Sequence, residues 1–306
     1  MMVASLFAIL GIFIYALALI IINANTIPNR ETDWLTTFNS YRVSSGVNRV
    51  TENPRLTVAA QHHADYLAST SAKFLVGEFE NLHKENPASP YYSSDGSILG
   101  TGVIAWTKGK YTSAVDQLMT APFHAIGILR ENLSEVGFGT AIAGEDAFSP
   151  KSRITNFSVI AGLQQNSRTK VILFPGPREK VHLNSFTGEN PEPREACGEN
   201  FEEFKGLPIF ASLLHNPDTS IRVILTLPSG RQLIEGTELC IVTENNFKTS
   251  DHIYGPAAKS IMKSENLVLI IPRSPLSEGK HTVQILEKSR PEFKWSFVFT
   301  APDLKF

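Results

Sequence analysis

Apolar side chains at helical spacing mark the first helix of the globular part of the chain. Trp34, Phe38 and Tyr41 stand at positions i, i+4 and i+7, which puts them on one face of an α-helix. The pattern predicts a helix over residues 31–45, and Gly46 follows as the residue type that most often ends a helix. We expect this apolar face to be buried in the core of the first domain.

A second amphipathic helix begins after Asn53. Asparagine is a favoured N-cap residue, and Pro54 suits the first helical position because an N–H there would have no partner within the helix. The apolar face of this helix consists of Leu56, Ala59, Ala60, His63, Tyr66 and Leu67. Because His63 lies on this face, we expect it to be a buried histidine with hydrogen-bond partners.

The rest of the first domain, residues 31–178, combines loops, one more helix and strands. A polar loop rich in Pro, Tyr and Gly is predicted over residues 84–102, and a helix over residues 112–119 ends before Pro122. Gly137 then introduces β structure, and the apolar runs FSVIAGL and KVILFP predict two strands. The predicted order is helix, helix, loop, helix, strand, strand.

Short β-rich segments fill the remainder of the chain, residues 179–306. Runs such as IRVILTL, TELCIVT, NLVLIIP and KWSFVFT are separated by turn residues, a spacing typical of an all-β sandwich. The Pro-, Glu- and Gly-rich residues 187–201 are the predicted linker, and Glu202 and Glu203 beside it are expected to be solvated. The predicted fold class is therefore α+β, with an immunoglobulin-like β-sandwich as the second domain.

The beginning of the chain predicts a membrane segment. Residues 3–22 carry no charge, and at about 1.5 Å per residue they can cross a hydrocarbon core of about 30 Å. A cleaved signal peptide normally has a shorter apolar stretch and a basic start, and Ile22 is bulky for a cleavage site after Ala24. The pattern favours an uncleaved transmembrane anchor within residues 1–24, with a cleaved signal peptide as the alternative.

Charge and cysteine content narrow the functional classes. The formal net charge of the 306 residues is −2, so no basic field attracts a nucleic acid. The two cysteines, Cys197 and Cys240, fit no zinc-binding spacing. In an exported protein they could form one disulfide, and the alternative is a pair of buried thiols.

Five phrases occur in a fixed order between residues 38 and 139. They are FNSYR with AAQHHADYLA, LHKENPASPYYSSDG, GVIAW, TAPFHAIGIL and SEVGFG. In this order they resemble the bacterial branch of the CAP superfamily, the cysteine-rich secretory, antigen 5 and pathogenesis-related proteins. The resemblance implies an α-β-α sandwich with a shallow cleft. More loosely, the second domain resembles the β-sandwich modules that follow CAP domains in some bacterial surface proteins.

The resemblance also implies a metal site in the cleft. In many CAP proteins two histidines and two acidic residues can hold a divalent metal, and the histidines map to His83 and His124. Glu85, in the H-x-E phrase, is the acid that the resemblance leaves for the cleft. Two neutral imidazoles and one carboxylate could bind zinc as an open three-ligand site. The alternative is that both histidines are structural.

The other acidic positions of the family are not filled. The Glu of the family's E-N-I-A phrase falls on Gly102 or Val103, and the helix acid falls near Asp116 or Gln117 without an aligned Glu. This departure weakens the expectation of a metal or of acid–base chemistry.

Two functions fit the implied cleft. We favour an extracytoplasmic, membrane-anchored or secreted module that is not an enzyme and holds a small ligand, lipid, peptide or cell-wall component. Tyr91 and Tyr92 are its candidate ligand contacts because tyrosine offers an apolar face with a hydrogen-bonding tip; loop packing is their alternative role. The second function is a zinc hydrolase with Glu85 as base. Neither a G-x-S-x-G nor an H-E-x-x-H motif is present.

Overall fold

A four-stranded sheet lies at the centre of the first half of the structure. The computed structural model describes residues 34–107, 111–288 and 290–301. The strands of this sheet, in spatial order, are β1 (Thr51–Glu52), β3 (Glu135–Ile142), β4 (Arg153–Ser158) and β2 (Val103–Thr107). β1 runs parallel to β3, whereas β3 and β2 both run antiparallel to β4.

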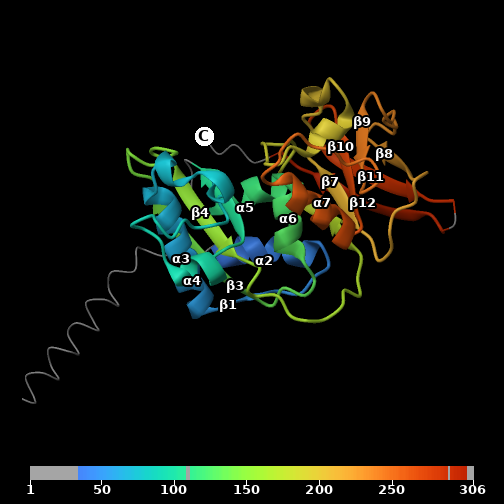
Figure 1. Ribbon diagram of the computed structural model, residues 1–306. Coiled ribbons are helices and arrows are strands. Elements are labelled where there is room, and N and C mark those ends of the chain that lie inside the picture. The colour runs from blue at the N-terminus through green and yellow to red at the C-terminus, as the bar shows by residue number, and fades with distance from the viewer. Residues whose placement is uncertain (1–33, 108–110, 289, 302–306) are drawn as a thin grey trace, which may run out of the picture. The chain divides into compact units, whose positions relative to one another are not determined.

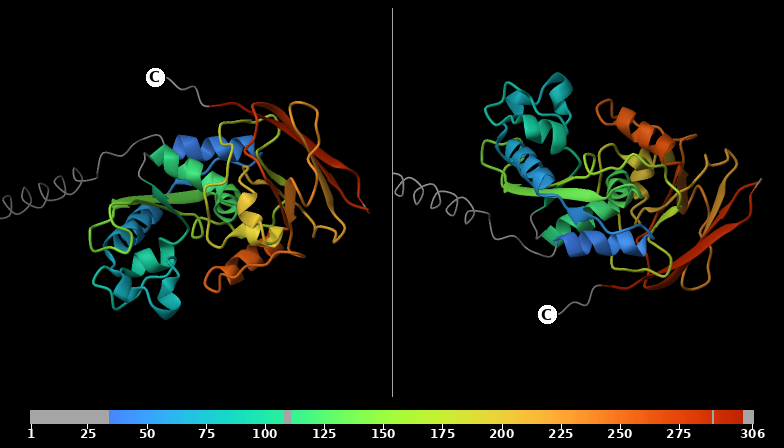
Figure 2. Two further views of the ribbon diagram at one scale, coloured as in Figure 1. Left: turned by 90° about the horizontal axis from the view of Figure 1, so that it is seen from above. Right: turned by 90° about the horizontal axis from the view of Figure 1, so that it is seen from below.

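Helices cover both faces of this sheet (Figure 1, Figure 2). One face carries α3 (Pro54–Ser69) with α4 (Ser94–Leu99) packed beside it. The opposite face carries α2 (Trp34–Ser44), α5 (Tyr111–Thr120) and α6 (Pro122–Leu129). These three layers agree with the α-β-α architecture that the resemblance implies.

Strand β2 separates the two layers of core. Val103 and Ala105 belong to the cluster that includes α2, α5 and α6, whereas Ile104 packs with Tyr66 and Leu67 of α3. Successive side chains of a strand point to opposite faces, so one short strand serves both cores.

Two glycines allow α3 to lie directly on the sheet. A side chain at Gly137 would collide with the backbone of Leu56, and one at Gly139 would collide with the backbone of Ala60. Both glycines lie inside β3. They therefore set the distance between helix and sheet, as glycine does where two backbones approach closely.

The structure confirms the predicted helices and corrects the predicted loop. The Asn53 side chain accepts hydrogen bonds from the N–H groups of Arg55 and Leu56 at the start of α3. The loop predicted over residues 84–102 contains α4, whose first turn is capped by the Ser93 hydroxyl. This helix has only six residues, too few for the periodicity of its apolar side chains to stand out.

Two further four-stranded sheets form the second half. The strands of one, in spatial order, are β5 (Ile172–Phe174), β7 (Ile209–Ser212), β10 (Leu267–Pro272) and β9 (Leu239–Val242). Those of the other are β6 (Lys180–Val181), β12 (Phe293–Phe299), β11 (Gly279–Leu286) and β8 (Arg222–Thr226). All their pairs are antiparallel except β6 with β12.

The second half departs from an all-β pattern at one helix. α7 (Gly255–Ser264) lies between β9 and β10 in the chain and buries Ala258 and Met262 at i, i+4 spacing. A stripe of two side chains is too short to predict a helix. The immunoglobulin-like assignment and the domain boundary after residue 178 stay predictions; β5, which precedes that boundary, pairs with β7.

The two halves share one continuous core. The Tyr41 ring of α2 lies 6.1 Å from the Phe174 ring of β5, and Phe174 in turn lies 5.5 Å from Phe210 of β7. The 3₁₀ turns η3 (Pro193–Cys197) and η4 (Phe201–Glu203) lie in the connection between β6 and β7. The two halves are therefore held together by apolar packing, not only by a covalent linker.

The predicted membrane segment, residues 1–24, lies outside the described residues. Within the described ranges, no helix combines the length and the apolar character that a membrane span requires.

A disulfide joins Cys197 of η3 to Cys240 of β9, with their Cα atoms 5.6 Å apart. The sequence left open whether these cysteines form a disulfide or are two buried thiols, and the structure contains the disulfide. It ties the connection between β6 and β7 to the sheet that contains β9.

We expect reduction of this disulfide to lower the free energy of unfolding by about 2–4 kcal/mol, because the bridge spans 43 residues and restricts the unfolded chain. The measurement is urea unfolding with and without a reducing agent. A Cys197→Ala/Cys240→Ala variant should match the reduced protein and should not respond to the reductant. Equal stability of the reduced and oxidised proteins would contradict the prediction.

Candidate functional site

A cavity of about 270 Å³ opens between the two halves. Its walls come from the loop before α4, from β2, from α5 and α6, and from two segments of the second half. The lining residues are Leu82, His83, Ile104, Ala105, Trp106, Gln117, Leu118, Ala121, His124, Thr187, Gly188, Glu189, Asn190 and Tyr254.

The structure brings His83 and His124 to the same cavity. His124 lies in the first turn of α6, where its backbone N–H and its Nδ1 both contact Oε1 of Glu189, at 2.9 and 2.7 Å. The Nδ1 atom of His83 is buried and has no hydrogen-bond partner among the described residues. The two imidazoles therefore differ, because one is anchored by a carboxylate and the other is not.

Burial, together with the smaller effects of the neighbouring His124 and His63, lowers the pKa of His83 to about 3. A buried imidazole loses the hydration that stabilises its charged form. His83 is therefore neutral over the physiological pH range.

Glu189 is the acidic residue of the site, and the sequence did not reveal it. Its side chain is 0 % exposed. The pKa of Glu189 is raised, because the effect of burial exceeds the opposing effects of the hydrogen bond and charge of His124. Glu189 lies in the stretch predicted to be a linker, 65 residues after His124. The sequence offers only an indirect signal for Glu189. Because the acidic residues of the family are missing from the cleft, His124 needs an acidic partner from elsewhere in the chain.

We refer to residues 187–191 as the strap. It lines the first cavity with Thr187, Gly188, Glu189 and Asn190. The Thr187 hydroxyl also contacts that of Thr120 at the end of α5, at 2.5 Å. The strap is thus bonded to both α5 and α6.

Glu85 does not line the cavity, which corrects its predicted role. One carboxylate oxygen lies 2.9 Å from Nδ1 of His63, and the other accepts a hydrogen bond from the N–H of Ser93 at 2.9 Å. The second ring nitrogen of His63 contacts the carbonyl oxygen of Leu82 at 3.1 Å. Glu85 and the buried His63 therefore hold the loop that carries His83, because they contact the backbone of Ser93 and Leu82.

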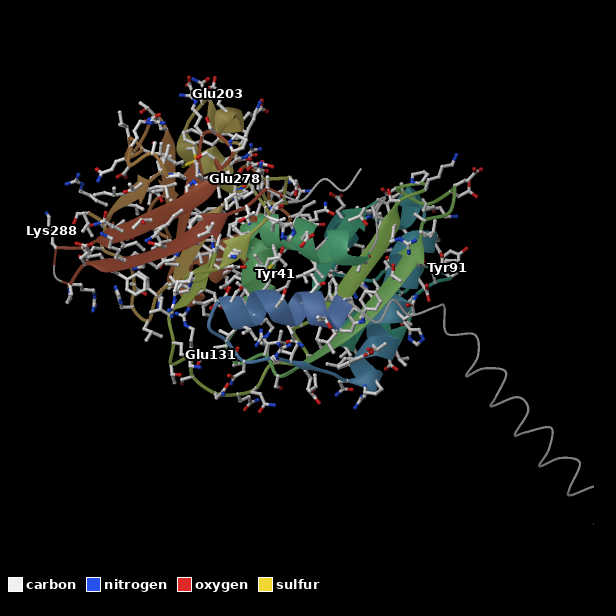
Figure 3. The ribbon with its side chains drawn as sticks, turned by 180° about the vertical axis from the view of Figure 1, so that it is seen from behind. Tyr41, Tyr91, Glu131, Glu203, Glu278 and Lys288 are labelled. Carbon is white, nitrogen blue, oxygen red and sulfur yellow. A yellow bond between two sulfur atoms is a disulfide. The ribbon has the colours of Figure 1, made fainter. Side chains whose placement is uncertain are left out.

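Tyr91 and Tyr92 also lie away from the cavity. They are 51 % and 37 % exposed and belong to none of its walls; Figure 3 shows Tyr91 at the outer edge of the first half. The tyrosine that lines the cavity is Tyr254 of the second half, whose ring lies edge-on to His83 at 6.0 Å. Its hydroxyl accepts from the N–H of Leu82 at 3.0 Å and contacts the Glu80 carbonyl at 3.3 Å.

The backbone explains why one family acid is missing. Gly102 precedes β2, and any side chain there would collide with the carbonyl oxygen of Phe157 in β4. Asp116 does not line the cavity either, because it accepts a hydrogen bond from Tyr41 at 2.6 Å and contacts His182 at 3.1 Å. Neither position supplies an acid to the cavity.

These residues do not fit a three-ligand zinc site. Across the part of the chain that the structure describes, no group of three or more His, Cys, Asp or Glu side chains could hold a metal ion. Glu85 is bonded to His63 instead of lying beside His83 and His124. The predicted ligand set therefore lacks its third member.

The comparisons with known proteins agree with the fold. A family model described as CAP, the cysteine-rich secretory protein family, matches residues 35–160. Residues 35–160 therefore form a CAP domain, and they include α2 except its first residue, α3 to α6 and the whole first sheet. No curated protein matches the chain.

We expect His83 to make the protein less stable in acid. Above pH 6.5 the His83 ring is neutral in both the folded and the unfolded protein. Between pH 6.5 and about pH 3 the ring is protonated in the unfolded chain but stays neutral in the folded protein. The free energy of unfolding therefore falls as the pH falls through this range, by at most about 1.4 kcal/mol per pH unit for this group. Urea unfolding at a series of pH values measures the slope.

The slope should be shallower in His83→Gln than in the wild type between pH 6 and 4. His62→Gln, which removes an exposed histidine, is the matched control and should keep the wild-type slope. The prediction is wrong if His83→Gln and wild type lose stability in parallel.

Proposed function

We propose that this CAP-domain protein is a non-catalytic binding module whose cavity holds a small, polar, uncharged ligand. The main observation in support of this function is a set of buried polar atoms that have no hydrogen-bond partners among the described residues. Four of them belong to cavity-lining residues: His83 Nδ1, Trp106 Nε1, Gln117 Oε1 and Glu189 Oε2.

Such atoms are exceptions that need an explanation, because nearly all buried polar groups in proteins are hydrogen-bonded. The indole N–H of Trp106 can only donate, whereas the free oxygens of Gln117 and Glu189 accept. Water can serve these atoms in the free protein, and a ligand that offers both donors and acceptors would replace it. Hydroxyl and amide groups, as in sugars and peptides, meet this requirement.

Charge supports a neutral ligand. His83 is neutral because its pKa is lowered, and the Glu189 carboxylate is already bonded to His124. The cavity wall contains no Lys, Arg or Asp, and the unpartnered oxygen of Glu189 can accept a hydrogen bond from a neutral donor. A small fragment of cell-wall glycan or peptide fits these properties better than an ionic metabolite.

The alternative function, a metal-assisted hydrolase, has less support. Its proposed base, Glu85, is bonded to His63 and Ser93. One observation favours a hydrolase without metal: His124 and Glu189 have the arrangement of a general base and its orienting carboxylate. The cavity wall includes no serine or cysteine, and the hydroxyl of its threonine, Thr187, contacts Thr120, so this arrangement would use water as the nucleophile.

We further propose that the protein acts outside the cytoplasm, membrane-anchored or secreted, and does not bind nucleic acid. The apolar residues 3–22 support export to or through a membrane. The Cys197–Cys240 disulfide supports an oxidising compartment. The formal net charge of −2 provides no overall basic field to attract a nucleic acid.

Two neutral probes test the binding function in the full-length chain: N-acetylglucosamine and N-acetylalanine amide. We expect a saturable change in fluorescence with each probe that disappears in Trp106→Phe, because Trp106 lines the cavity. Gln117→Met should weaken binding about three- to tenfold, which corresponds to one lost hydrogen bond.

Gln165→Met, which changes an exposed glutamine, is the control and should bind as the wild type does. Both probes should be recovered intact after long incubation, as judged by mass spectrometry. Absence of any saturable signal would overturn the binding proposal, and cleavage of a probe would favour the hydrolase.

A further inference from the structure

A second cavity, of about 260 Å³, adjoins the first. His83, His124, Asn190 and Tyr254 line both. We propose that this second cavity is an apolar subsite of the same binding site, completed by α7. On this basis, which rests on the proposed function, the ligand is amphipathic: a neutral polar group in the first cavity joined to one compact apolar group in the second.

The wall of the second cavity is apolar. Its side chains include Val103, Phe123, Val159, Ile160, Ala258 and Ile261. Such a wall favours the binding of an apolar ligand group. The gain in binding free energy is proportional to the apolar area that is removed from water. By contrast, Trp106, Gln117 and Glu189, which contribute three of the four unpartnered polar atoms, line only the first cavity.

Two polar side chains that line only the second cavity, those of Arg130 and Asn81, have partners within the protein. The Arg130 guanidinium donates to the Glu265 carboxylate at 2.9 Å. The Asn81 side-chain oxygen accepts from the N–H of His83 at 3.0 Å. Each group thus has a hydrogen-bond partner within the protein, which leaves the apolar side chains as the main contacts for a ligand group.

The size of the cavity limits the apolar group. An engineered apolar cavity of about 150 Å³ binds benzene, so 260 Å³ takes one aromatic ring or a branched aliphatic group with room to spare. Ligand pockets usually have about 300–1,000 Å³. Each cavity alone lies below that range, and a ligand that spans both reaches it.

Helix α7, in the second half of the chain, contributes part of the wall of this subsite. Ala257, Ala258 and Ile261 of α7 line the cavity, and Tyr254 directly before the helix lines both cavities. Ala257 is exposed and Ala258 is buried. Their small side chains leave the space that the apolar group of the ligand would occupy.

Matched probe pairs test this inference in the full-length chain. N-acetylphenylalanine amide is compared with N-acetylalanine amide, and phenyl β-glucoside with methyl β-glucoside. We expect the aromatic member of at least one pair to bind about tenfold more tightly or better, because its ring is buried. The pair that shows the larger gain identifies a peptide-like or a glycan-like source of the ligand.

Variants of α7 locate the effect. Ala257→Trp should fill the subsite and abolish the aromatic preference while the smaller probes still bind. Ile261→Thr should reduce the preference without filling the space. Lys259→Trp, on the same helix but outside the cavity lining, should keep the wild-type preference.

The outcomes separate the two proposals. If wild type binds the aromatic and small probes equally, or if Ala257→Trp keeps the aromatic preference, the apolar subsite is wrong and the binding function stands. If no probe binds to wild type, both proposals are overturned. A preference that is lost in Ala257→Trp and kept in Lys259→Trp supports the amphipathic ligand.

Discussion

The contact between Glu189 and His124 is the interaction on which the cavity depends. A carboxylate with a fully buried side chain is unfavourable unless it is hydrogen-bonded. Here both the backbone N–H and the ring of His124 meet one of its oxygens. This contact fixes the strap against the first turn of α6. Without it, the strap would keep only the Thr187–Thr120 contact as its hydrogen bond to the helices of the CAP domain.

The loop that carries His83 is held from two sides. Glu85 and His63 bind it to α3, and Tyr254 of the second half bonds to the backbone at Leu82 and Glu80. In this chain the acid of the H-x-E phrase therefore positions the loop of its neighbouring histidine and does not share a ligand with it. The cost of burying Glu85 is offset by these hydrogen bonds.

The second half of the chain takes part in the site. It supplies the strap with Glu189 to the polar cavity and α7 to the apolar cavity. A continuous core and the Cys197–Cys240 disulfide fix these segments in place. The binding properties that we propose therefore belong to the combination of a CAP domain with this particular C-terminal half, and not to the CAP domain by itself.

The sequence by itself determined the local elements and the two histidines. Apolar spacing predicted α2 and α3, Asn53 predicted a cap, and the ordered phrases placed His83 and His124 in one cleft. These features depend on neighbours in the chain or on a resemblance. Only the tertiary structure determined which acidic residue and which aromatic residue lie beside these histidines in the cavity. Glu189 and Tyr254 reach the histidines across 65 and 171 residues of chain, and Glu85 is directed to His63 by packing on α3. Such pairings depend on how three sheets and their helices pack, which no local pattern encodes.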